Sequence, residues 1–270
     1  MTAARAVGRP ATVVVPTTTK ALMIARIRTA GAADVIQRGA SWREADDYLK
    51  EVVMPAGQAR GEEAVYVPPF DHPDVWDGNS SLIDELKERP DALICSVGGG
   101  GLFCGLQLGL QRKGWEDVPV LAVETEGAAS LRHSLQAGKL SSLDEITSIA
   151  TSLGAKTVAS KAFELGRRAN VGSVVLSDAE AAMGCWRLTD DERMMVEPAC
   201  GVNVALCYDG RLLHFLPWLD QDSKVIIVLC GGSDVSLETL LEYKSTYGDV
   251  EKRMPWVNGL PSTATPSKCT

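Results

Sequence analysis

Residues 92–110 read ALICSVGGGGLFCGLQLGL, and this stretch decides the fold. The run at 92–97 is apolar without polar alternation, which is typical of a strand buried on both faces. Four glycines follow at 98–101, and the apolar residues after them have helical spacing. Glycine is costly in any ordered element, so a row of four indicates a backbone that another group approaches closely.

The rest of the chain alternates strand and helix signals in the same way. Further apolar or β-branched runs predict strands at 11–15, 34–36, 64–67, 118–124, 172–177 and 224–229. A loop rich in proline and aspartate is expected at 68–79, before a helix at 80–89. Strands of this kind separated by helices predict an α/β protein with an open, mostly parallel sheet and helices on both faces. Its ligand is expected at the carboxyl ends of the strands.

Composition narrows the classes of function. A net charge of −8 over 270 residues argues against non-specific binding to nucleic acid or to an anionic membrane, and no apolar run is long enough to span a bilayer. Seven dispersed cysteines without a CxxC pair predict reduced thiols in a cytoplasmic protein. With only three histidines, none at ligand spacing, a histidine metal site or a Ser-His-Asp triad is not expected.

The two glycine clusters, SVGGGGL and LCGGSD, both follow predicted strands. The first one opens a helix, so its backbone N–H groups and the positive end of the helix dipole face outward together. That arrangement favours an anion, usually a phosphate. The alternative is a tight strand-to-helix turn in which glycines only relieve crowding. The spacing fits neither GxGxxG nor a Walker A loop, so NAD and nucleoside triphosphates are the weaker candidates.

Several stretches resemble, in order, the serine/threonine dehydratases, which are pyridoxal-phosphate enzymes. They are ATVVVP.TT.AL, YVPPFDHPDVWDG, ALICSVGGGGLFCGLQLGLQ, VPVLAVETEGAAS, GKLSSLDEITSIATSLGAKTV, VEPACG and VIIVLCGGSDVSL. The resemblance runs from about Pro10 to about Leu240 and implies the tryptophan-synthase-β-like fold, fold type II, incomplete at the N-terminus. The cysteine that opens CGGSD is most similar to the L-serine dehydratases.

The resemblance also implies domains and site residues. Residues 10–66 would be a remnant of the small domain and 67–247 the large cofactor-binding domain. Independently of the resemblance, residues 248–270 lose periodicity, which predicts a disordered tail. The cofactor phosphate would lie against Gly98, Gly99, Gly100, Gly101 and the amide of Leu102, with Cys230 beside the pyridine nitrogen. A monovalent cation such as K⁺ would be held by Glu124 and by the carbonyls of Gly98, Ala128, Leu153 and Ala155. Taken alone, Glu124 could equally be an ordinary carboxylate at a strand end.

The activity implied is β-elimination from L-serine to give pyruvate and ammonia, with L-threonine as a second substrate, in a homodimer. The family also needs a lysine in a segment like S-F-K-x-R-G and a loop S-x-G-N, and neither is found in these residues. We therefore expect an N-terminally truncated serine dehydratase that is inactive alone. The alternatives are a non-catalytic binder of pyridoxal phosphate or phosphate, which could be the regulatory partner of an intact subunit, and a fragment without a stable fold.

Overall fold

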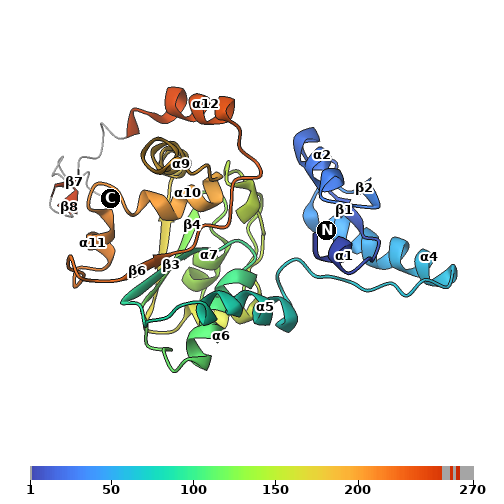
Figure 1. Cartoon of the computed structure of the whole chain (residues 1–270), viewed down its shortest axis with the longest axis horizontal. Coiled ribbons are helices and arrows are strands. Elements are labelled where there is room, and N and C mark those ends of the chain that lie inside the picture. Colours follow the sequence, from blue (N-terminus) through green and yellow to red (C-terminus); the bar gives the residue numbers. More distant parts are fainter. Residues whose placement is uncertain (1, 251–255, 258–259, 262–270) are drawn as a thin grey trace. The chain divides into compact units, whose positions relative to one another are not determined.

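The protein is described by a computed structural model that covers residues 2–250, 256–257 and 260–261. The chain divides into two compact units, Met1–Pro68 and Pro69–Thr270 (Figure 1). The predicted disordered tail falls mostly outside the described residues. Within it, β7 (Trp256–Val257) pairs antiparallel with β8 (Leu260–Pro261).

The first unit contains a two-stranded parallel sheet, in which β1 (Thr12–Val15) pairs with β2 (Asp34–Gln37). Its helices are α1 (Thr2–Ala6), α2 (Ala21–Thr29), α3 (Trp42–Tyr48), a π-helical segment (Leu49–Val53) and α4 (Met54–Ala59). The strand predicted at 64–67 is wrong. Val65 and Val67 are 76% and 78% exposed, and no described strand lies beside this run to pair with it. The β-branched composition alone does not make a strand without a partner.

The second unit is built on a four-stranded parallel sheet in the order β5-β4-β3-β6. The strands are β3 (Ala92–Ser96), β4 (Val120–Thr125), β5 (Val171–Leu176) and β6 (Val225–Ile227). Each overlaps a run from which a strand was predicted, although β4 and β5 extend one residue beyond theirs. In the register, Ile94 of β3 lies opposite Leu121 of β4 and Ile227 of β6. The parallel strands bring four carboxyl ends to one edge of the sheet.

Helices cover both faces of this sheet (Figure 1). Leu93 and Cys95 of β3 pack with the helices on one face, α5 (Pro73–Asp84), α6 (Gly101–Arg112), α7 (Ser130–Ala137) and α8 (Ser160–Gly166). The intervening Ile94 packs with those on the other face, α9 (Asp178–Glu192) and α10 (Pro198–Ala205). The remaining elements are a 3₁₀ turn (Thr151–Leu153), α11 (Arg211–Phe215) and α12 (Leu237–Tyr247). The predicted open α/β sheet is confirmed.

Two helix boundaries differ from the sequence prediction. α5 begins at Pro73, inside the expected loop, and ends at Asp84. Its start is set by His72, whose ring nitrogen accepts the Asp74 N–H at 3.2 Å, and by proline at the first helical position, where a missing N–H does no harm. Among the described residues, no helix is both long and apolar enough to cross a membrane.

Candidate functional site

The glycine row forms the turn between β3 and α6, at the carboxyl edge of the sheet. Gly100 precedes the first residue of the helix and has a φ of 94°, a conformation that residues with a Cβ rarely adopt. A Cβ at this position would also lie 2.5 Å from the Cβ of Ala162 on α8. Only glycine fits at Gly100.

The neighbouring glycines are crowded by the chain itself. A Cβ at Gly98 would lie 2.9 Å from the Cα of Leu153, and one at Gly101 would lie 2.7 Å from the carbonyl oxygen of Phe70. At Gly99 a Cβ would overlap the ring of Phe70. Close packing within the chain, the alternative that the sequence left open, therefore accounts for the missing side chains. This packing does not provide hydrogen-bond acceptors for the backbone amides of the row.

Those amides are the part of the loop that suits an anion. Among the described residues, none of the N–H groups of 98–102 donates to a backbone or side-chain acceptor. The same turn is anchored from its carbonyl side, because the amide of Ala159 donates to the oxygen of Gly99 at 2.9 Å. Unpaired N–H groups at the start of a twelve-residue helix, with its dipole behind them, fit a phosphate. The residues present thus fit the phosphate end of pyridoxal phosphate.

Cys230 lies beyond the end of β6, the strand that pairs with β3. The amide of Val228 donates to the oxygen of Ile94 at 2.9 Å, so the two strands remain paired almost up to this cysteine. The sheet therefore brings the segment of Cys230 and the glycine row to neighbouring positions at its carboxyl edge. Cys230 is exposed.

The side chain of Cys230 is held in its neutral form by a second cysteine. Its amide donates to the Sγ of Cys200 at 3.2 Å. A hydrogen bond between the two side chains raises the pKa of Cys230 and lowers that of Cys200. Partial burial of its sulfur further raises the pKa of Cys230. Burial also opposes the thiolate of Cys200, which the amides of Cys230 and Gly231 favour. Near neutral pH Cys230 therefore presents a thiol, not a thiolate.

Glu124 is a fully buried carboxylate in β4. Its two oxygens accept the amides of Leu131 at 2.7 Å and of Arg132 at 2.8 Å, in the first turn of α7. Burial raises its pKa to about 7, although the two amides oppose that shift. Such a carboxylate gains from a cation that compensates its charge.

Some of the predicted cation ligands lie together. Gly98 is packed against Leu153, as its missing Cβ shows, and its carbonyl oxygen accepts the hydroxyl of Ser130 at 3.4 Å. Ala128 packs in the same apolar cluster as Leu153. The amide of Ala155 donates to the oxygen of Leu153 at 2.8 Å. Whether the five groups share one cation stays a prediction.

Two contacts around this site were not found from the sequence. Phe70 lies in a stretch that was expected to be an open loop, yet it packs against the glycine row. Cys200 lies in VEPACG, a motif to which no role was given, and it is the hydrogen-bond partner of Cys230. The sequence has three cysteine-glycine pairs in stretches that resemble the family, CG at 104, 200 and 230, so it did not single out the pair that meets.

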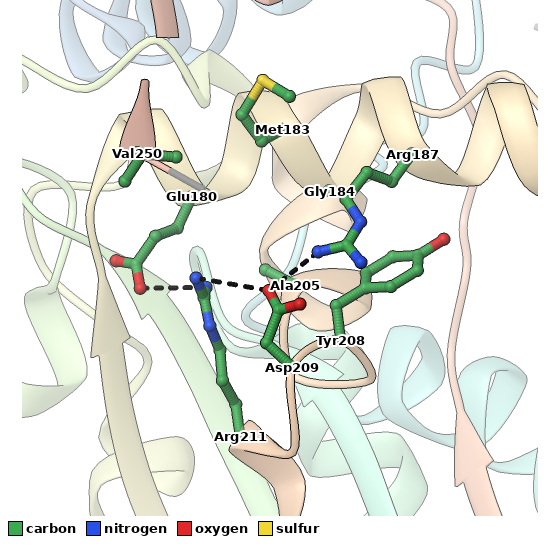
Figure 2. Close-up of a pocket in the computed structure, with 9 residues that line it drawn as sticks. All are labelled: Glu180, Met183, Gly184, Arg187, Ala205, Tyr208, Asp209, Arg211 and Val250. Carbon is green, nitrogen blue, oxygen red and sulfur yellow. Dashed lines mark hydrogen bonds and ion pairs between the residues drawn. The ribbon is translucent and has the colours of Figure 1, made fainter. Parts of the chain in front are cut away.

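A separate pocket lies among α9, α10 and α11 and contains none of the predicted site residues (Figure 2). Its charges pair with one another. Arg211 and Glu180 are 3.0 Å apart, Arg187 and Asp209 are 2.8 Å apart, and the Arg187 guanidinium lies over the ring of Tyr208. Each of the two acids in this lining is thus paired with an arginine.

Comparison with known proteins gives concordant matches. The family described as "Pyridoxal-phosphate dependent enzyme" matches residues 1–231. The L-serine dehydratase of Saccharomyces cerevisiae strain AWRI1631 is 42% identical over 258 residues, which are 91% of this chain and 76% of that protein. The human L-serine dehydratase/L-threonine deaminase is 42% identical over 94% of this chain and 77% of its own length. A fungal L-serine ammonia-lyase from Rhizomucor miehei superposes with a TM-score of 0.81 at 38% identity, over 90% of this chain and 76% of that structure.

Proposed function

Because the chain belongs to the pyridoxal-phosphate-dependent enzymes and shares 42% identity with their L-serine dehydratases, we propose that it carries the cofactor-binding part of an L-serine ammonia-lyase. The reaction would release pyruvate and ammonia from L-serine, and 2-oxobutanoate from L-threonine. The second substrate is proposed from the human relative, whose name includes threonine deaminase.

The row of unpaired amides at 98–102 is the observation that carries this proposal. A phosphate bound there would accept hydrogen bonds from several of them without meeting a Cβ. The cofactor supplies the electron withdrawal that loosens the bonds at the α-carbon of the amino acid. This chain's contribution is to orient the cofactor and to set the charge around it.

Cys230 would set that charge at the ring nitrogen. A thiol whose pKa is raised stays neutral and is a weak hydrogen-bond partner. It stabilises a protonated ring nitrogen far less than a carboxylate would. We assign to Cys230 the role of keeping this nitrogen unprotonated, which favours β-elimination over transamination.

Glu124 and the carbonyls of Gly98, Ala128, Leu153 and Ala155 would hold a monovalent cation, for which K⁺ is our choice. The support is the buried carboxylate with its raised pKa and the packing of Gly98 against Leu153. Oxygen ligands of this kind suit a hard cation. The cation would tie β4, the glycine row and the 3₁₀ turn to one another.

Among the 270 residues of this sequence, none matches the lysine segment S-F-K-x-R-G or the loop S-x-G-N. We therefore propose that this polypeptide by itself does not release pyruvate. The second candidate function, a non-catalytic binder of pyridoxal phosphate or phosphate, rests on the same observation. We further propose a homodimer, in line with the family resemblance, and a cytoplasmic location, since the six described cysteines are unpaired thiols.

The test is the intact mass of the native protein from its source cells after borohydride reduction. A reduced cofactor adduct on a lysine outside this 270-residue sequence, in a protein larger than 28.8 kDa, supports the lyase. A mass equal to this chain without an adduct, together with measurable binding of pyridoxal phosphate, supports the non-catalytic binder. Release of pyruvate by the pure 270-residue chain would overturn the proposed inactivity.

A further inference from the structure

Two cysteines far apart in the sequence meet at the carboxyl edge of the sheet. Cys200 lies in the first turn of α10 and Cys230 follows β6. The amide of Cys230 donates to the Sγ of Cys200 across 3.2 Å. Because an amide nitrogen lies about 1.5 Å from its own Cα, the sulfur of Cys200 is within about 4.7 Å of the Cα of Cys230. A disulfide bond between the two sulfurs is about 2.05 Å long, so a rotation of the Cys230 side chain can bring its sulfur within bonding distance of the Sγ of Cys200.

The two thiols differ in the way that a reactive and a resolving cysteine differ. Cys200 is buried in the first turn of α10. Its pKa is lowered by the Cys230 side chain and by the amides of Gly231 and Cys230, against the opposing effects of burial and of the nearby Glu197 carboxylate. Cys230 is exposed and keeps its proton.

The space next to Cys230 is open. Gly231 has a φ of 150°, and a Cβ there would meet nothing within 4 Å, while its oxygen accepts the amide of Glu197 at 3.0 Å. Cys95 and Cys185 lie near the pair, but burial raises the pKa of both, so they remain thiols.

We propose that Cys200 and Cys230 form a reversible disulfide when the protein meets a peroxide. The thiolate of Cys200 attacks one peroxide oxygen, the O–O bond breaks, and hydroxide leaves to give a sulfenic acid at Cys200. The sulfur of Cys230 then attacks this sulfur, the S–O bond breaks, and the thiol proton of Cys230 leaves with the oxygen. Two thiols and one hydrogen peroxide thus give one disulfide and two waters.

The bond would join α10 to the segment after β6 and remove the free thiol of Cys230. If the proposed function holds, this oxidation also changes the partner of the cofactor's ring nitrogen. That consequence rests on the proposed function, whereas the disulfide itself does not. The test is therefore made on the thiols and needs no enzyme activity.

The experiment treats the purified chain with one equivalent of hydrogen peroxide, blocks free thiols and digests it with trypsin without reduction. Cys200 falls in the peptide 194–211 and Cys230 in the peptide 225–244. We expect these two peptides linked, two hydrogens lighter than their sum, and separated again by dithiothreitol. The peptide 194–211 also contains the exposed Cys207, so Cys207→Ser is the matched control and should keep the link.

Two variants test the separate roles of Cys200 and Cys230. Cys200→Ser should lose the link, and a far-ultraviolet spectrum checks that this buried position still folds. Cys230→Ser changes an exposed side chain and should lose the link while leaving a sulfenic acid on Cys200 that dimedone traps. Absence of the link in both the wild type and Cys207→Ser refutes the proposal. So does a link that persists in Cys200→Ser through Cys207.

Discussion

The amide of Leu102 is one proposed hydrogen-bond donor to the phosphate, and it can be removed without adding a side chain to the glycine row. Leu102 is the second residue of α6 and is half-buried. Proline is tolerated in the first helical turn, where the N–H has no partner within the helix. Leu102→Pro therefore deletes the N–H, and Leu102→Ala is its matched control, because it loses the same side-chain packing and keeps the N–H.

The size of the effect follows from the charge on the ligand. A hydrogen bond to a charged group is worth about 1.5–3 kcal/mol. At 1.4 kcal/mol for each factor of ten, we expect pyridoxal phosphate to bind Leu102→Pro about 10- to 150-fold more weakly than Leu102→Ala. Pyridoxal, which lacks the phosphate, should bind the two variants equally.

Equilibrium dialysis of both ligands against both variants measures these four affinities. Thermal melts confirm that the two variants are equally folded at the dialysis temperature. Equal affinities of the two variants for pyridoxal phosphate would refute the assignment of this amide to the phosphate. An equal loss of pyridoxal and pyridoxal phosphate would show that the proline acts through the ring or the fold.

Three further changes test other parts of the structure. Gly100→Ala places a Cβ in a left-handed conformation 2.5 Å from Ala162 and should cost about 3 kcal/mol of stability in a urea titration. Gly78→Ala, within α5 and with nothing within 4 Å, should instead raise stability, by up to about 1 kcal/mol. Because the pKa of Glu124 is raised, the folded state keeps its proton between about pH 4.5 and about pH 7, where the unfolded state has lost it. The contribution of this group to the free energy of unfolding therefore falls as pH rises through that window, by about 3 kcal/mol in total. Glu124→Gln should remove this dependence of stability on pH. If the cation site is correct, K⁺ should weaken the same dependence in the wild type. An unchanged dependence in the variant contradicts the assignment. Arg211→Leu leaves the buried carboxylate partner 3.0 Å away uncompensated and should cost about 3–5 kcal/mol in the same titration, and a loss below about 1 kcal/mol would show that water compensates this charge.

The central strands were predictable because their physical requirement is local. Ala92–Ser96 and Val120–Thr125 are buried on both faces, so nearly every position is apolar or small and the run stands out from its surroundings. The run at 64–67 is also apolar and contains two β-branched valines, yet Val65 and Val67 face solvent. Whether a strand forms depends on a neighbour that can pair with it, and the local sequence does not contain that information.

In the candidate site too, local features were predictable from the sequence and contacts between distant segments were not. The glycine row and the helix after it indicate that another group packs closely against this backbone and that its amides are free. Both are properties of the local backbone. The sequence could not predict that this group is Phe70, because Phe70 reaches Gly99 only through the packing of α5 on α6. The contact between Cys200 and Cys230 likewise depends on α10, a helix that the sequence prediction did not place.

A crystal structure of this chain with pyridoxal phosphate tests the central claim most directly. The phosphate should lie within hydrogen-bond distance, about 2.9 Å, of amides in the row 98–102, with the ring nitrogen facing the Sγ of Cys230. A phosphate bound elsewhere, or a glycine row whose amides are taken up by the chain itself while the cofactor is bound, would contradict the claim.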